Sequence, residues 1–199
     1  MTQKNKKEKE LKILRTVFKK KRYPKYTFHE RPDFIVHHMN DFGVEITEFY
    51  PDETVARMVN MPNYAEKVTE KSYIHKDDIN KLEVVNTEYF NKKKKKWIKI
   101  EQPAVRQENM PIHERITVLL SKIKGKSELL NSYDKSLENI DLIIYDGRSS
   151  MIDGINDEYM RKTIREMYSL DVFEKSGYRN IYLSIPLHDG RPAEVIKLK

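Results

Sequence analysis

The chain has 199 residues, a formal net charge of +7 and no cysteine. This length suits one domain, or one domain with an insertion, and the lack of cysteine excludes disulfides and cysteine-ligated zinc. The sequence has neither an apolar run of the roughly 18 residues that a membrane span needs nor a signal-like first segment. We therefore expect no membrane partner and a cytoplasmic location, in a bacterium or, for a phage protein, in its host. The isoelectric point near 9.3 favours a polyanionic partner, and nucleic acid is the leading candidate.

The first fifty residues predict a helix followed by a β-hairpin. Residues 6–21 place Leu11 and Leu14 at helical spacing among lysines and glutamates, as in an amphipathic helix. Two β-rich runs follow, 33–37 and 42–49, separated by a turn-like Met-Asn-Asp sequence. We expect these two runs to pair.

The next segment, residues 51–103, has a less regular pattern and predicts a helical insertion. Helices are expected near 52–59 and near 77–91, followed by a short strand at 97–101. Between them lies a run of five lysines, which is typical of a solvated loop but would hold phosphates beside a substrate groove. The lysines of this candidate nucleic-acid contact are Lys92, Lys93, Lys94, Lys95 and Lys96.

The last part of the chain alternates helices and strands. A long helix is expected over 112–133, a buried strand over 140–145, a helix over about 156–168 and a last strand over 181–187. The complete order predicts an α/β domain in which helices flank a mixed sheet.

Two acidic residues in the predicted hairpin carry the clearest chemistry. Side chains alternate between the faces of a strand, so Glu45 shares a face with Thr47 and interrupts a β-rich run. If the two runs pair, Asp33 near the start of one strand approaches Glu45 on the next. Two carboxylates in this position can hold one hard divalent cation, which can activate water and stabilise charge on a phosphate.

The stretch Pro32-Asp33, followed by Glu45-Ile46-Thr47, resembles the motif of the PD-(D/E)XK nuclease superfamily, also called restriction-endonuclease-like. Glu30 and the Phe-Gly-Val-Glu-Ile-Thr sequence are similar to a local variant found in some members. The resemblance implies one nuclease-like domain over residues 1–199 with an αβββαβ core, interrupted by the insertion at 51–103. It also implies a Mg²⁺- or Mn²⁺-dependent nuclease in which Asp33 and Glu45 bind the metal.

The sequence departs from the family pattern at Thr47, which occupies the position of the motif lysine. Threonine supplies no positive charge to the reaction. Some family members draw this lysine from the following helix. The helix predicted at 112–133 turns by about 100° per residue, which places Lys126 at the edge of its apolar stripe. Lys122 lies one turn away on the outer flank of that stripe. Lys124 points elsewhere. Lys126 is thus the first candidate and Lys122 the second, although both are also placed to extend from the helix edge into solvent.

The resemblance further implies an acidic metal ligand from the first helix. Glu10 is the first candidate because it borders the apolar face of that helix, while Glu8 and Glu30 are alternatives. A solvated surface carboxylate is the competing interpretation for each of them.

Three functions remain open on the sequence alone. The first is a metal-dependent nuclease that hydrolyses phosphodiester bonds, of DNA in preference to RNA. The second is a catalytically degenerate nuclease fold that binds nucleic acid, because the motif lysine is missing. The third is a phage or mobile-element protein that binds and inhibits a host protein through its basic surface.

Overall fold

The computed structural model describes residues 3–50, 53–91, 94–105, 112–146, 162–163, 171–185 and 193–199. The chain divides into two compact units, which are described separately below. The sheet unit comprises Thr2–Tyr50 and Ile112–Lys199, and the inserted unit comprises Pro51–Pro111. Within the described residues, no helix is both long and apolar enough to span a membrane.

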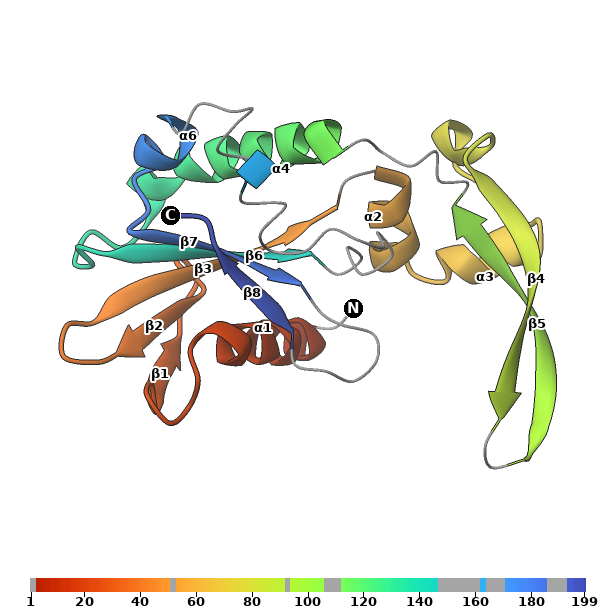
Figure 1. Ribbon diagram of the computed structural model, residues 1–199, viewed down its shortest axis with the longest axis horizontal. Helices are drawn as coiled ribbons and strands as arrows, with labels where there is room; N and C mark the ends of the chain where they lie inside the picture. Colours follow the sequence, from red (N-terminus) through yellow and green to blue (C-terminus); the bar gives the residue numbers. More distant parts are fainter. Residues whose placement is uncertain are drawn as a thin grey trace. The chain divides into compact units, whose positions relative to one another are not determined.

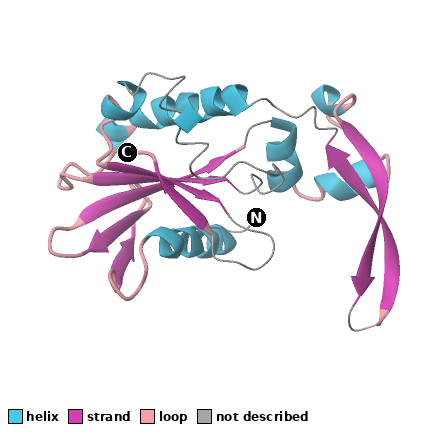
Figure 2. Ribbon diagram, in the orientation of Figure 1, coloured by secondary structure: helices cyan, strands magenta, loops and turns pink. Residues whose placement is uncertain are grey.

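The sheet unit is built on a six-stranded sheet with the order β1-β2-β3-β6-β7-β8 (Figures 1 and 2). β3 is parallel to β6 and β6 to β7, whereas the other neighbours are antiparallel. The strands are β1 (Lys25–Phe28), β2 (Phe34–His37), β3 (Phe42–Phe49), β6 (Ile140–Asp146), β7 (Asn180–Ile185) and β8 (Glu194–Lys197). The predicted α/β class, the mixed sheet and the hairpin of β2 with β3 are confirmed, and β1 and β8 are additional strands.

Helices cover both faces of this sheet. α1 (Gln3–Val17) lies against one face, and α4 (Ile112–Ser127) lies against the other with the short α6 (Asp171–Glu174) (Figure 1). Ile13 and Leu14 of α1 share a buried core with alternate residues of β2 and β3. Ile116, Leu119 and Ile123 of α4 share a second core with residues of β6, β7 and β8. The helical periodicity of the sequence therefore places the apolar stripes of α1 and α4 correctly.

The alternation of side chains along β3 decides which residues face each helix. Val44 and Ile46 point toward α1 and belong to its core. Phe49 belongs to the α4 core, and Glu45 and Thr47 share its face by strand periodicity. Both of these polar residues are buried, at 6% exposure of the whole residue. The fold thus holds a carboxylate on the α4 side of a central strand.

Two predicted helices are longer than the observed ones. The helix expected over 6–21 ends at Val17, and the chain then turns toward Pro24, ahead of which helical backbone is disfavoured. The helix expected over 112–133 ends at Ser127 and is followed by a 3₁₀ turn, η2 (Leu130–Ser132). The helix expected over 156–168 lies almost entirely outside the described residues.

The inserted unit contains the largest correction to the sequence-based prediction, because its second half is a β-hairpin and not a helix. It consists of α2 (Glu53–Asn60), α3 (Tyr64–Thr69), the 3₁₀ turn η1 (Lys76–Asp78), β4 (Leu82–Asn91) and β5 (Lys96–Val105). The helix expected over 77–91 is wrong, since β4 pairs with β5 along all ten residues. Its β-branched and aromatic side chains favour this arrangement. The strand expected over 97–101 is the central part of β5.

Candidate active site

Asp33 is held where β2 ends its pairing with β3. The last pair of this ladder joins Phe34 to Val44, so the backbone amide of Ile46 lies beyond it. The Asp33 carboxylate accepts a hydrogen bond from that amide at 2.8 Å and takes the place of the missing backbone partner. A Cβ atom on Gly43 would lie 2.5 Å from Pro32 Cγ, so glycine is needed for the chain before Asp33 to approach β3.

Glu45 and Lys126 form an ion pair across the sheet–helix interface. Lys126 Nζ lies 2.6 Å from Glu45 Oε1, and the exposed fractions of the two side chains are 22% and 8%. The structure thus brings the first candidate lysine to the acidic site. Lys122 is exposed on α4, as is Lys124.

The electrostatics of this site are unfavourable to a charged Asp33. Burial raises the Asp33 pKa to about 7, and the negative charges of Glu45 and Glu10 raise it as well. The amide hydrogen bond from Ile46 and the positive charge of Lys126 oppose this rise only in part. Negative charge therefore exceeds positive charge around Asp33, which is the condition that a bound divalent cation relieves.

Glu10 extends from α1 toward this site. It contributes to the field at Asp33, and its own carboxylate lies 3.4 Å from the ammonium group of Lys6 on the same helix. Glu48 lies on the opposite face of β3 from Glu45 and pairs with Lys9 at 2.8 Å. Strand alternation therefore separates Glu48 from the candidate site and leaves Glu45 within it.

Two buried tyrosines lie beside Glu45 and Lys126. The Tyr133 hydroxyl is close enough to Glu45 for the carboxylate charge to act on it, and burial raises the pKa of both Tyr133 and Tyr178. The Tyr178 hydroxyl donates to the backbone oxygen of Lys126 at 3.1 Å. Sequence periodicity does not indicate this position of Tyr133. Tyr133 was expected within the helix at 112–133, but it enters the core from extended backbone beyond η2.

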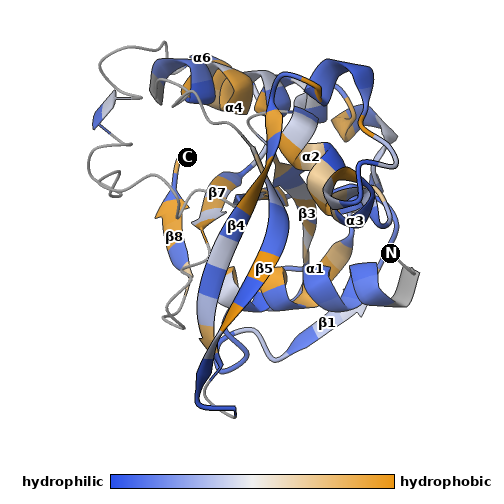
Figure 3. Cartoon of the chain, turned by 90° about the vertical axis from the view of Figure 1, so that its right-hand side faces the viewer, coloured by the Kyte–Doolittle hydropathy of each residue, from blue (hydrophilic) through white to orange (hydrophobic). Residues whose placement is uncertain are grey.

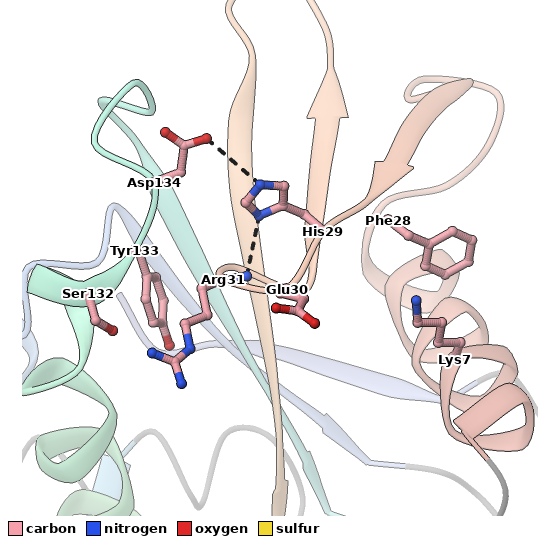
Figure 4. Close-up of a pocket in the computed structure, with 8 residues that line it drawn as sticks. All are labelled: Lys7, Phe28, His29, Glu30, Arg31, Ser132, Tyr133 and Asp134. Atoms are coloured by element: carbon pink, nitrogen blue, oxygen red, sulfur yellow. Dashed lines mark hydrogen bonds and ion pairs between the residues drawn. The ribbon is translucent and has the colours of Figure 1, made fainter.

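A cavity of about 660 Å³ adjoins this tyrosine (Figure 4). Its lining residues are Lys7, Phe28, His29, Glu30, Arg31, Ser132, Tyr133 and Asp134. His29 Nε2 lies 3.8 Å from Asp134 Oδ2, and the Arg31 amide donates to His29 Nδ1 at 3.3 Å. Figure 4 shows the Arg31 side chain extending toward Ser132 and Tyr133. Tyr133 therefore borders the cavity and also lies near Glu45.

The donor set fits a cation that keeps part of its water shell. Within the described ranges, no three histidine or acidic side chains converge as a metal cluster. Mg²⁺ is commonly held by one or two carboxylates, with water and substrate phosphate completing its octahedron. Asp33 and Glu45 supply such a pair, and burial first and the charge of Glu45 second raise the Asp33 pKa.

The candidate lysine run belongs to the inserted unit. Lys94, Lys95 and Lys96 are exposed at the turn between β4 and β5, whereas Lys92 and Lys93 lie outside the described residues. The structure therefore places these three lysines at the turn end of the β4–β5 hairpin.

Comparisons with protein-family models, with curated proteins and with solved structures found no match to this chain. The candidate site consequently rests on the geometry and electrostatics of its own residues.

Proposed function

We propose that the sheet unit is a metal-dependent nuclease of the PD-(D/E)XK type that hydrolyses phosphodiester bonds, of DNA in preference to RNA. The observation that carries the proposal is the Lys126–Glu45 ion pair next to Asp33, whose pKa is raised to about 7. Two carboxylates and one lysine are the side chains that the resemblance requires, and Lys126 supplies from α4 the charge that Thr47 lacks.

The order of elements supports the same proposal. From α1 to β6 the sheet unit runs helix, three strands, helix, strand, which is the order that the resemblance implies. The inserted unit interrupts this order between β3 and α4. Asp33 immediately precedes the second strand of the series and Glu45 lies on the third, in the order that the resemblance implies.

Each residue has a distinct part in the proposed reaction. Mg²⁺ or Mn²⁺, when bound by Asp33 and Glu45, supplies charge stabilisation and an activated water. Asp33 must lose its proton to bind the cation, and the ion pair with Lys126 holds Glu45 in position. The Lys126 ammonium stabilises negative charge that develops on the phosphate.

The cavity beside the site provides the cationic groups that a phosphate backbone needs. Arg31 and Lys7 line it, and guanidinium groups bind phosphate oxygens with two parallel hydrogen bonds. Glu30 also lines the cavity and is an exposed carboxylate. We propose that the nucleic-acid strand follows this cavity to Glu45.

The proposal is tested by cleavage of linear, circular and single-stranded DNA and of RNA, each with EDTA, Mg²⁺ or Mn²⁺. We expect cleavage only with metal, and its loss in Glu45→Gln. Glu48→Gln is the matched control, because this carboxylate lies three residues away on the opposite face of β3 and pairs with Lys9. Equal cleavage by both variants would exclude Glu45 as the metal ligand.

The binding-only alternative is favoured by one observation, the presence of buried Thr47 where the motif has lysine. It predicts nucleic-acid affinity that falls with salt but no cleavage with any metal. The absence of both cleavage and nucleic-acid binding would instead support the protein-inhibitor function.

A further inference from the structure

The β4–β5 hairpin forms a ribbon whose base is packed against α3. Each strand has ten residues, and the pairs run in register from Leu82 with Val105 to Asn91 with Lys96. At about 3.3 Å per residue, the ribbon is roughly 30 Å long. Leu82 at its base is buried with Tyr64 and Val68 of α3. Most of the remaining ribbon residues are partly or fully exposed, and hydrophobic and hydrophilic residues are mixed along it (Figure 3).

Two exposed aromatic side chains lie together at the turn end of this ribbon. Phe90 pairs directly with Trp97, so the two rings share one face, and their centroids are 5.6 Å apart. Phe90 is 47% exposed and Trp97 is 65% exposed. Large aromatic groups left in solvent are unfavourable and, when clustered, indicate a surface that a partner covers.

The turn that joins the two strands is strongly basic. Lys94, Lys95 and Lys96 are exposed. The Asn91 side chain accepts a hydrogen bond from the Lys94 amide at 3.0 Å, and Lys95 adopts a left-handed conformation with φ 49°. Lys94, Lys95 and Lys96 thus immediately precede Trp97 in the sequence.

Acidic residues do not neutralise this end of the ribbon. The sequence from Tyr89 to Ile98 contains no acidic residue. The nearest acidic residue of β4, Glu88, pairs with Lys99 on β5 at 3.2 Å, farther from the turn. The turn end therefore combines net positive charge with exposed aromatic rings.

A purely structural role explains only part of this arrangement. Cross-strand aromatic pairs stabilise hairpins, and an isolated two-stranded ribbon needs such help. Stability alone does not account for a tryptophan that is two-thirds exposed beside three lysines. A polyanion with apolar surfaces between its charges does account for it, and nucleic acid has this chemistry.

We propose that the turn end of the β4–β5 ribbon binds duplex DNA. The major groove admits a two-stranded ribbon, and apolar side chains can wedge against base steps when a ribbon enters a groove. Lys94, Lys95 and Lys96 contact phosphates, and the Phe90–Trp97 pair contacts base steps. The proposal takes its partner, DNA, from the proposed function, and it concerns binding by the inserted unit and not cleavage.

The experiment measures binding in EDTA, where cleavage cannot occur. Trp97 is the only tryptophan of the chain, so its intrinsic fluorescence reports directly on the turn end of the ribbon. Titration of the full chain with a short DNA duplex should change this fluorescence in a saturable way. Binding without any cleavage would leave this inference intact while the proposed nuclease function fails.

Charge contacts are tested by the triple variant Lys94→Gln, Lys95→Gln, Lys96→Gln. Each lost phosphate contact should lower the slope of log affinity against log salt by about 0.9, so the slope should fall by roughly 2 to 3. The matched control replaces Lys19, Lys20 and Lys21 by Gln, since these are also three consecutive exposed lysines. An equal decrease in both variants would show a general charge effect and overturn the assignment to the ribbon.

The aromatic contact is tested by Phe90→Ala and Phe90→Tyr, which leave Trp97 as the probe. Loss of a base-stacking ring should weaken DNA binding roughly tenfold in the alanine variant. The tyrosine variant should bind as the wild type does. Tyr73→Ala is the control, because Tyr73 is an exposed aromatic residue of the same unit, at 43%. Unchanged affinity in Phe90→Ala, or tighter binding of single-stranded DNA or RNA than of duplex, would overturn the proposal.

Discussion

The sheet unit and the inserted unit each hold an aspartate away from solvent, in opposite surroundings. In the inserted unit, Asp78 is completely buried and accepts hydrogen bonds from Thr54 at 2.7 Å, Arg57 Nε at 2.8 Å and Tyr64 at 2.7 Å. In the sheet unit, Asp33 accepts one hydrogen bond from a backbone amide and lies in the field of Glu45.

The pKa values of these aspartates follow from their partners. The hydrogen bonds from Arg57 hold the pKa of Asp78 well below its usual range, against the effect of burial. Burial and like charge raise the Asp33 pKa to about 7. Burial is therefore not the distinguishing property. A carboxylate whose partners are all protein groups stabilises its unit, whereas a carboxylate short of partners is available to an external cation.

The largest expected effect is that of Asp78→Ala on the stability of the inserted unit. The change leaves Arg57 and the Tyr64 hydroxyl without their buried acceptor, and breaking a buried ion pair from one side costs about 3–5 kcal/mol. Amide hydrogen exchange within residues 53–91 should show this loss of free energy of unfolding.

Asp77→Ala is the control for this change, because the Asp77 carboxylate is 55% exposed. Its ion pair with His75, at 3.6 Å, lies at the surface. Asp77→Ala should alter exchange little. Similar effects of the two substitutions would contradict the structural role assigned to Asp78.

The next effect concerns Lys126, whose ammonium group donates a charged hydrogen bond to Glu45. Lys126→Met keeps most of the packing stem but removes the charge, so folding should persist. Cleavage should fall about 100-fold, which corresponds to roughly 2.7 kcal/mol of transition-state stabilisation. Mn²⁺ affinity should not decrease, because a positive charge has been removed from beside the metal ligands.

Lys124→Met controls for a general loss of positive charge, since Lys124 is exposed on the same helix. It should cleave as the wild type does. If Lys126→Met is equally active, Lys126 does not supply the missing charge, and Lys122 becomes the next candidate.

The positions of Glu45 and Lys126 on their elements could be predicted because they depend on local periodicity. Alternation along a strand places Glu45 on one face of β3, and the helical period places Lys126 at the edge of the α4 stripe. These regularities do not require knowledge of distant residues. The position of Tyr133 does, because this residue follows η2 and lies near Glu45 of β3 and Tyr178 of the segment after α6. Sequence spacing alone could not have indicated it.

The nature of β4 could not be predicted for a related reason. Leu82, Val85 and Tyr89 recur at helical spacing, although the same stretch is rich in β-branched residues. Pairing with β5 decides between the two structures, and this pairing is a contact between segments. The edge strand β8 was missed in the same way, since its four residues form a strand only through β7.

The smallest expected effect tests whether Asp33 lacks partners in the metal-free protein. The Asp33 pKa is about 7 in the folded chain and about 3.9 in an unfolded one. The protonated side chain contributes stability that is fully present below the unfolded pKa and is lost as pH rises through the folded pKa.

The amide introduced by Asp33→Asn would be neutral at every pH and would keep an oxygen for the Ile46 amide. In EDTA, this variant should therefore be more stable than wild type above pH 7, by roughly 1–2 kcal/mol once partial solvent exposure is allowed for. The two proteins should melt alike near pH 4.

A matched substitution at Asp134 should have the opposite sign. The amide of Ser136 donates to the Asp134 carboxylate at 2.9 Å and holds its pKa below the usual range. Its stabilising effect is present above the unfolded pKa and is lost as pH falls, so Asp134→Asn should lower the melting temperature at neutral pH.

Mn²⁺ should make wild-type protein more stable than Asp33→Asn, because it binds and stabilises wild-type protein but not this variant. It should not reverse the stabilities of wild type and Asp134→Asn. Melting curves from pH 4 to about 8, with EDTA and with Mn²⁺, measure all of these differences. A stabilising effect of Asp33→Asn that is the same at both ends of this range would show that charge repulsion is not its cause. Asp33 would then be a structural aspartate like Asp78, and the cation site would lose its first ligand.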